Sequence, residues 1–153
     1  MKDVHFRRIN ATNVLEICNL SNTLSKVQRD MVADNAISIA QASFSENAWF
    51  RSIYAGDHAI GFIMLHQSSN YDDGIDVHGI YLWRFMIAGP YQGKGYGKQA
   101  IELLIKHLKG HGINEMVTSC EVGEGSPIDF YKQLGFTPNG ETFEGETGLV
   151  LQF

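Results

Sequence analysis

The pattern of apolar and polar positions predicts a chain in which helices alternate with strands. In segment 97–108 the apolar residues recur at i, i+3, i+4 and i+7, the spacing that gathers side chains on one face of a helix. Shorter apolar runs bounded by Gly, Asn or Asp predict strands, and Gly56-Asp57 between two such runs predicts a hairpin. The expected order is strand 4–9, a helix capped by Thr12, a helical region over 31–44, strands 49–55, 58–66 and 79–87, helix 97–108, strand 115–120, helix 126–134, and one or two closing strands over 143–153.

This order of elements predicts a mixed α/β fold in one domain covering residues 1–153, which is long enough to bury a core. Apolar residues make up 44% and charged residues 19%, as in an ordinary globular protein, and the longest apolar runs are too short to span a bilayer. The N-terminus shows no apolar signal core. We therefore expect a cytoplasmic protein without a membrane partner.

Charge and metal-binding residue types narrow the candidate partners further. The formal net charge of −5 argues against nucleic acid, because phosphate binding favours a basic surface. Cys18 and Cys120 form no Cys-x-x-Cys pair, and the six histidines match no metal-ligand spacing. We expect free thiols and no metal site.

A glycine-rich turn lies between the strand that ends at residue 87 and the helix that follows. Residues 91–97 read Tyr-Gln-Gly-Lys-Gly-Tyr-Gly. A turn of this kind presents main-chain N–H groups and the positive end of the helix dipole at one point, which predicts an anion site. It is not a P-loop, because Gly97-Lys98 is followed by Gln99, and its glycines, spaced by two, do not match a dinucleotide fingerprint. A structural turn without a ligand stays the alternative.

A second motif, over residues 126–136, has the features of a complete short helix. Ser126 is the expected N-cap, Pro127 falls in the first turn, and Asp129 occupies the third helical position. Gly135 then supplies the left-handed residue that ends the helix.

Together these two motifs resemble the GCN5-related N-acetyltransferase (GNAT) family. Gln92-x-x-Gly95-x-Gly97 is similar to the family's pyrophosphate-binding turn, and Phe130-Tyr131 with Gly135-Phe136 is similar to the end of its coenzyme-side helix. The resemblance extends along nearly the whole chain. It implies a GNAT fold, in which helices flank a mixed, mostly antiparallel central sheet and a splayed strand pair binds the coenzyme. It also implies acetyl-coenzyme A as the cosubstrate.

The resemblance assigns roles to particular residues. Tyr131 would lie beside the coenzyme sulfur and protonate the departing thiolate as general acid; the alternative is a core tyrosine whose hydroxyl is satisfied locally. The residues expected to bind the coenzyme are Met86, Ile87, Gln92, Gly93, Lys94, Gly95, Tyr96, Gly97 and Lys98. For the two lysines, ordinary surface solvation is the alternative.

The general base is harder to assign. At pH 7 only on the order of one primary amine in a thousand is neutral, so attack requires removal of a proton. The family often carries a carboxylate on the strand before the turn, but segment 81–87 contains none. The base candidates are Asp76, His78 and Glu121, with a relayed water as a rival. Asp72, Asp73 and Asp76 would suit a multiply charged amine, or simply form a solvated turn.

The acceptor follows from a finer resemblance. Segments 81–87, 91–98 and 35–42 look like the bacterial spermine/spermidine (diamine) acetyltransferases. This implies acetyl transfer to a primary amine, first of all a polyamine, by direct attack in a ternary complex. The alternatives are another small-molecule or protein amine (an antibiotic, an amino acid or a protein N-terminus) and a coenzyme-A-binding sensor without turnover. Many relatives form homodimers, and segment 149–153 could serve as the interface or lie inside the sheet.

Overall fold

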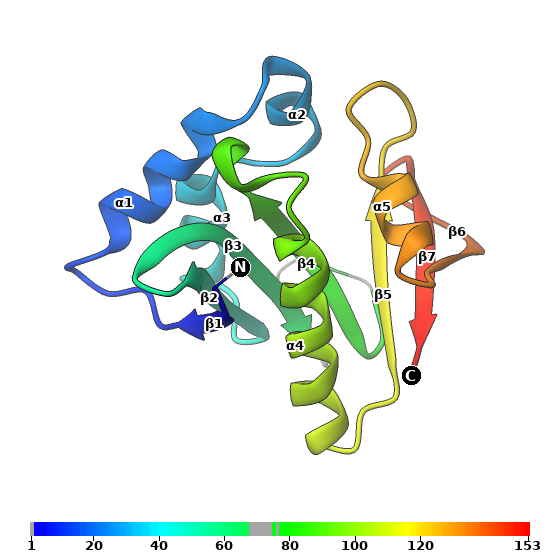
Figure 1. The fold of residues 1–153 in the computed structure, drawn as a ribbon. Coiled ribbons are helices and arrows are strands. Elements are labelled where there is room, and N and C mark those ends of the chain that lie inside the picture. The colour runs from blue at the N-terminus through cyan, green and yellow to red at the C-terminus, as the bar shows by residue number, and fades with distance from the viewer. Residues whose placement is uncertain (1, 68–74, 76) are drawn as a thin grey trace.

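The computed structural model describes residues 2–67, 75 and 77–153. In this part of the chain seven strands form one sheet in the order β1-β2-β3-β4-β5-β7-β6 (Figure 1). All neighbouring strands are antiparallel except β4 and β5, which are parallel. The strands are β1 (Val4–Arg7), β2 (Ala48–Ala55), β3 (His58–Gln67), β4 (Ile80–Ile87), β5 (Glu115–Cys120), β6 (Thr137–Phe143) and β7 (Glu146–Gln152). The expected mixed, mostly antiparallel sheet is confirmed.

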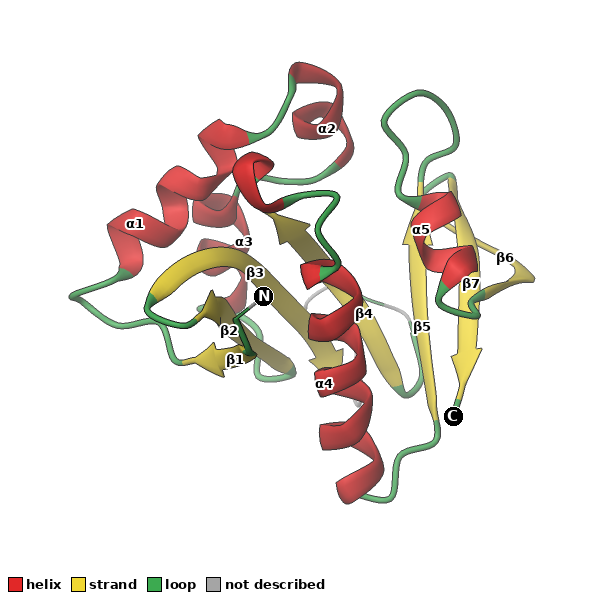
Figure 2. Ribbon diagram, in the orientation of Figure 1, coloured by secondary structure: helices red, strands yellow, loops and turns green. Residues whose placement is uncertain are grey.

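Helices cover both faces of the sheet (Figure 2). Because side chains alternate along a strand, Ile63 and Leu65 of β3 pack in a cluster with α4 and α5, whereas Phe62 and Met64 pack in a second cluster with α1 and α3. The helices are α1 (Val14–Asn19), α2 (Lys26–Met31), α3 (Asn35–Ala42), α4 (Tyr96–Gly110) and α5 (Ile128–Gln133), with the 3₁₀ turns η1 (Leu20–Thr23) and η2 (Gly89–Tyr91).

The helices near the N-terminus differ from the expectation. The N-cap of α1 is Asn13, not Thr12, and the Thr12 hydroxyl instead donates to Asn10 Oδ1 at 2.6 Å. The region expected as one helix over 31–44 holds only α3, while α2 precedes it. A capping box explains where α2 begins, since Ser25 accepts from the Gln28 N–H and Gln28 Oε1 accepts from the Ser25 N–H.

The C-terminal strands also differ from the expectation. Strand β6 begins at Thr137, six residues before the expected closing region, and forms the edge of the sheet. Pro138 and Gly140 are unusual in strands, so the sequence pattern did not predict β6. An edge strand tolerates both residues, and the pairing of β6 with β7 is irregular after Pro138. Strand β7 lies between β5 and β6, so residues 149–152 lie inside the sheet.

The pairing of β4 with β5 is short, and this leaves a gap in the sheet. The two strands pair only at Tyr81 with Val117 and at Leu82 with Thr118. Beyond these pairs β4 continues to Ile87 along β3, while β5 continues to Cys120 along β7. The expected splayed strand pair is therefore present.

Replacing Leu104 by Ala in α4 should lower the free energy of unfolding by about 2–5 kcal/mol, because this fully buried side chain would leave a cavity under the sheet. Leu15→Ala in α1 is the control, since the Leu15 side chain is 76% exposed and its loss should change stability by less than about 0.5 kcal/mol. Urea unfolding followed by circular dichroism measures both, and equal losses in the two variants would contradict the assigned core.

Candidate active site

The glycine-rich turn has the geometry of an anion site. Gly93 and Gly95 have φ angles of +72° and +87°, a left-handed conformation that glycine adopts without strain. Gly95 is the N-cap of α4 and makes no side-chain capping bond, because glycine has no side chain. The N–H groups of the first turn of α4 therefore point from the end of the helix without a side-chain acceptor.

Two other residues fix the position of this turn. Gln92 Nε2 donates to the Ile87 carbonyl oxygen at 2.8 Å, and Gln28 Nε2 donates to Gln92 Oε1 at 2.9 Å, so the turn is tied to both β4 and α2. A Cβ atom placed on Gly97 would lie 3.1 Å from the Phe130 ring, so glycine allows α4 to pack closely against α5. Besides its expected role in coenzyme binding, Gln92 therefore holds the turn in position against β4 and α2.

A cavity of about 530 Å³ opens beside this turn; we call it the turn cavity. Its wall includes seven of the nine residues expected to bind the coenzyme: Met86, Ile87, Gln92, Gly93, Gly95, Gly97 and Lys98. Lys94 and Tyr96 are not among the lining residues; Lys94 is exposed, and the Tyr96 ring packs edge-on against Tyr91. Gly125 of the β5–α5 loop contributes to the opposite wall.

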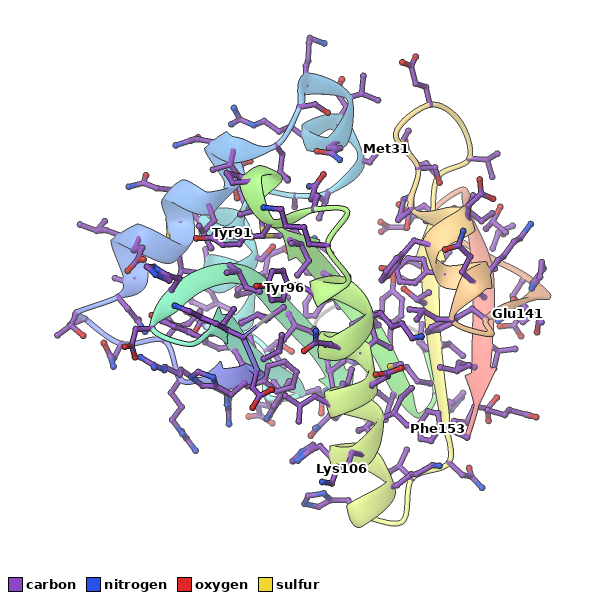
Figure 3. All side chains as sticks on the ribbon, viewed as in Figure 1. Met31, Tyr91, Tyr96, Lys106, Glu141 and Phe153 are labelled. Carbon is purple, nitrogen blue, oxygen red and sulfur yellow. The ribbon has the colours of Figure 1, made fainter. Side chains whose placement is uncertain are left out.

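A second cavity, of about 540 Å³, lies over the gap between β4 and β5; we call it the gap cavity. Residues of α2, β4, β5, α5 and the β6–β7 turn line it. The two cavities adjoin, because both are lined by Met31, Val32, Phe85 and Pro127. Figure 3 shows Met31 at the end of α2, on the side that faces the β5–α5 loop.

The base candidates fall in different places. Glu121 lines the gap cavity, whereas His78 is exposed and lines neither cavity. Asp72, Asp73 and Asp76 lie outside the described residues, so their expected roles stay predictions. His78 was chosen for its position in sequence before β4, and the structure does not bring it to the cavities.

Tyr131 reaches the gap cavity from α5. Its side chain is only 5% exposed, and its main-chain N–H donates to the Pro127 carbonyl at 3.0 Å. Burial raises the pKa of the Tyr131 phenol well above its usual value, and a hydrogen bond with the Thr118 side chain only partly offsets this. The phenol is therefore neutral at physiological pH and carries a proton that it can donate.

A chain of three polar side chains also lines the gap cavity. Tyr81 Oη lies 2.7 Å from Ser119 Oγ, and Ser119 Oγ donates to Glu146 Oε1 at 2.7 Å. Burial is the main cause that raises the pKa of Tyr81 to about 12. Sequence reasoning missed Ser119 and Glu146, because these residues meet only through the pairing of three strands.

Arg84 places a positive charge at the same cavity. Its Nη1 donates to the Trp83 carbonyl at 3.0 Å and its Nη2 to Gln41 Oε1 at 2.9 Å. The buried Nε has no hydrogen-bond partner among the residues that the structure describes. Burial lowers the pKa of the guanidinium, while Tyr81, Glu146 and Glu144 act in the opposite direction.

Two further features concern the described ranges 2–67, 75 and 77–153 only. They contain no group of three or more His, Cys, Asp or Glu side chains arranged to hold a metal ion. They also contain no helix of the length and apolar character that crossing a bilayer requires.

Comparison with known proteins decides the family. The sequence profile described as the Acetyltransferase (GNAT) family matches residues 15–136. The chain belongs to this family. This GNAT chain is 35% identical over 99 residues to the spermine/spermidine N(1)-acetyltransferase of Bacillus subtilis strain 168, and the match covers 63% of this chain and 64% of that protein.

Solved structures agree with this GNAT chain in fold. An acetyltransferase from Thermus thermophilus has a TM-score of 0.76 at 15% identity, and the alignment covers 100% of both chains. The PaiA N-acetyltransferase from Thermoplasma acidophilum, solved in complex with coenzyme A, has a TM-score of 0.65 at 18% identity and covers 99% of both chains. At this level of identity the likeness shows the GNAT fold.

Replacing Gly97 by Val should weaken coenzyme A binding at least about tenfold, because a Cβ at this position meets the Phe130 ring and forces the start of α4 away from the turn cavity. Gly110→Val at the other end of α4 is the matched control, since a Cβ there meets nothing within 4 Å. Calorimetric titration with coenzyme A measures both affinities. Wild-type affinity in the Gly97 variant would refute the placement of the coenzyme at this turn.

Proposed function

We propose that this GNAT chain transfers an acetyl group from acetyl-coenzyme A to a primary amine. The observation that carries the proposal is the pair of adjoining cavities, one beside an uncapped glycine turn and the other over the gap between β4 and β5. The coenzyme would occupy the turn cavity, with its pyrophosphate at the first-turn N–H groups of α4. The acceptor amine would occupy the gap cavity.

The main chain of β4 would hold the pantetheine arm. One edge of β4 pairs with β3 at Met86 and Ile87, and the other edge has no strand beside it after Leu82. This free edge offers N–H and C=O groups to an extended ligand, in the way that an added strand binds a sheet edge. The Ile87 carbonyl already accepts a bond from Gln92, so it offers only its remaining lone pair.

In the proposed reaction the amine nitrogen attacks the thioester carbon directly, and the carbon–sulfur bond breaks as the amide forms. Tyr131 gives its phenolic proton to the departing thiolate. Since the phenol is buried and neutral, it can act as acid over the whole physiological pH range. Cys120, the nearby candidate for a covalent acetyl-enzyme, is buried, and burial raises its pKa and disfavours the nucleophilic thiolate.

A polyamine is the first candidate for the acceptor. It is the substrate that the name of the Bacillus subtilis relative gives for that protein. Four carboxylates line the gap cavity and could attract a multiply charged amine: Asp30, Glu121, Glu144 and Glu146. The expected contribution of Asp72, Asp73 and Asp76 stays part of this proposal.

Arg84 favours a second candidate, an amine that also carries a carboxylate, such as an amino acid. The buried Arg84 Nε has no hydrogen-bond partner in the described part of the chain, and a substrate oxygen would remove the cost of leaving this group unpaired. A guanidinium binds a carboxylate through charge-assisted hydrogen bonds, which a polyamine cannot supply.

Replacing Tyr131 by Phe should lower kcat by about 10²–10⁴-fold while coenzyme A affinity stays unchanged, because only the proton donor is lost. Tyr54→Phe is a matched control, since Tyr54 is also 5% exposed but lines neither cavity. Thiol release with acetyl-coenzyme A and spermidine measures turnover. Equal rates in the wild type and the Tyr131 variant would eliminate the acid role.

Pairs of amines that differ only by a carboxylate separate the two acceptor candidates. We expect kcat/KM to be at least about tenfold higher for putrescine than for ornithine, and higher for cadaverine than for lysine, because the carboxylates that line the gap cavity would repel the added carboxylate of the amino acid. A higher kcat/KM for ornithine and lysine would favour the carboxylate-bearing acceptor, provided that this preference disappears when Arg84 is replaced by Met. If the protein binds coenzyme A but acetylates no amine, the result would favour the alternative of a coenzyme-A-binding sensor without turnover.

A further inference from the structure

We propose that Glu146 is the terminal base of the reaction and that it receives the proton of the acceptor ammonium through Tyr81 and Ser119. The inference rests on the proposed function, since it needs an amine in the gap cavity. All three residues line that cavity, and the two oxygen–oxygen distances in the chain are both 2.7 Å.

The direction of the chain follows from the chemistry of its groups. An ionised carboxylate only accepts hydrogen bonds, so the Ser119 hydroxyl donates its single proton to Glu146. Ser119 Oγ can then only accept from Tyr81, which makes the Tyr81 phenol the donor. The Tyr81 oxygen keeps lone pairs free to accept a proton from a substrate.

The strand register brings the three residues to one face of the sheet. Tyr81 pairs with Val117, and Ser119 lies two positions further along β5, on the same face as Val117. Ser119 pairs with Gly148 of β7, and Glu146 lies two positions before Gly148. The chain Tyr81–Ser119–Glu146 is therefore a diagonal across three adjacent strands.

Tyr131 reaches the same cavity from the opposite face. It belongs to the hydrophobic cluster of α4 and α5, which also contains Leu82 and Cys120, the neighbours of Tyr81 and Ser119 in sequence. Because β4 and β5 are unpaired beyond Leu82 and Thr118, both groups line one cavity. A proton can thus leave the amine on one face of the sheet while another reaches the sulfur from the other.

The proton transfers along the relay balance without leaving Tyr81 deprotonated. As the ammonium gives a proton to the Tyr81 oxygen, Tyr81 gives its own proton to Ser119, and Ser119 gives its proton to Glu146. The products are a neutral amine and a neutral Glu146 carboxyl group, which later loses its proton to water. The second proton, released from nitrogen as the amide forms, returns to the Tyr131 oxygen and replaces the proton that Tyr131 has given to the coenzyme sulfur.

Several other titratable groups line the gap cavity together with Glu146. From the other elements around the gap cavity they are Arg29 and Asp30 of α2, Tyr81 and Arg84 of β4, Cys120 of β5, Glu121 of the β5–α5 loop, Tyr131 of α5 and Glu144 of the β6–β7 turn. Of these, Glu144 and Glu121 are exposed, whereas Glu146 itself is half-buried.

Glu146→Gln tests the relay, because glutamine still accepts the Ser119 hydrogen bond but takes no proton. At neutral pH we expect kcat/KM to fall by about 10²–10⁴-fold. We also expect the rate of the variant to rise steadily with pH, because the acceptor ammonium then loses its proton in solution. Ser119→Ala should give the same profile, with coenzyme A affinity unchanged in both variants.

Glu141→Gln is the matched control, since Glu141 is an exposed carboxylate on β6 of the same hairpin and lines neither cavity (Figure 3). Wild-type turnover of an amine with an unchanged rate and profile in Glu146→Gln would overturn the relay alone. Failure of the wild-type protein to acetylate any amine would overturn the proposed function and the relay together. Circular dichroism and coenzyme A titration verify that each variant is folded.

Discussion

The parallel pairing of β4 with β5 ends after two residue pairs, and the positions of both cavities depend on this end. In a continuous parallel ladder, the main-chain groups of the two strands would bond to each other. The sheet would then separate Tyr131 on one face from Tyr81 on the other. Because the ladder ends, β4 keeps a free edge as far as Ile87, and the turn that follows places the N-terminus of α4 beside that edge.

Polar groups at the gap between β4 and β5 need hydrogen-bond partners other than a neighbouring strand. Thr118 Oγ1 donates to the Leu82 carbonyl at 3.0 Å, so a side-chain hydrogen bond joins β5 to β4 at their last residue pair. Two hydrogen bonds link Tyr81 to Ser119 and Ser119 to Glu146. By contrast, the buried Nε of Arg84 has no hydrogen-bond partner among the described residues. Buried polar groups are costly unless they are paired, so such an exception at a cavity wall is where a ligand atom is expected. Ile63 and Phe62, which belong to the apolar clusters on the two faces of the sheet, have no polar side-chain atoms and hold the layers together.

Several local signals were sufficient, although the N-caps of α1 and α5 are Asn13 and Pro127 and not the expected Thr12 and Ser126. The spacing of apolar residues predicted α4, the glycine turn predicted an uncapped helix start, and Gly135 predicted the end of α5, where its φ angle is +104°. The relay to Glu146 was beyond reach because it depends on β7 lying beside β5, and no local pattern specifies which strands become neighbours. The same limit explains His78, which was selected for its nearness in sequence to β4 but lies exposed and away from both cavities.

Charge in the gap cavity constrains how any acceptor can lie there. Arg84 carries a fixed positive charge, since a guanidinium stays protonated even when burial lowers its pKa. An acceptor ammonium has the same sign as Arg84, so its favourable position is at Glu144 and Glu146, where the Tyr81 oxygen is also available. The opposite end of the acceptor then lies toward Arg84, where a second ammonium is repelled and a carboxylate is attracted. A polyamine therefore has to direct its remaining charges away from this side chain, and that requirement makes Arg84 the residue that decides between the two acceptor classes.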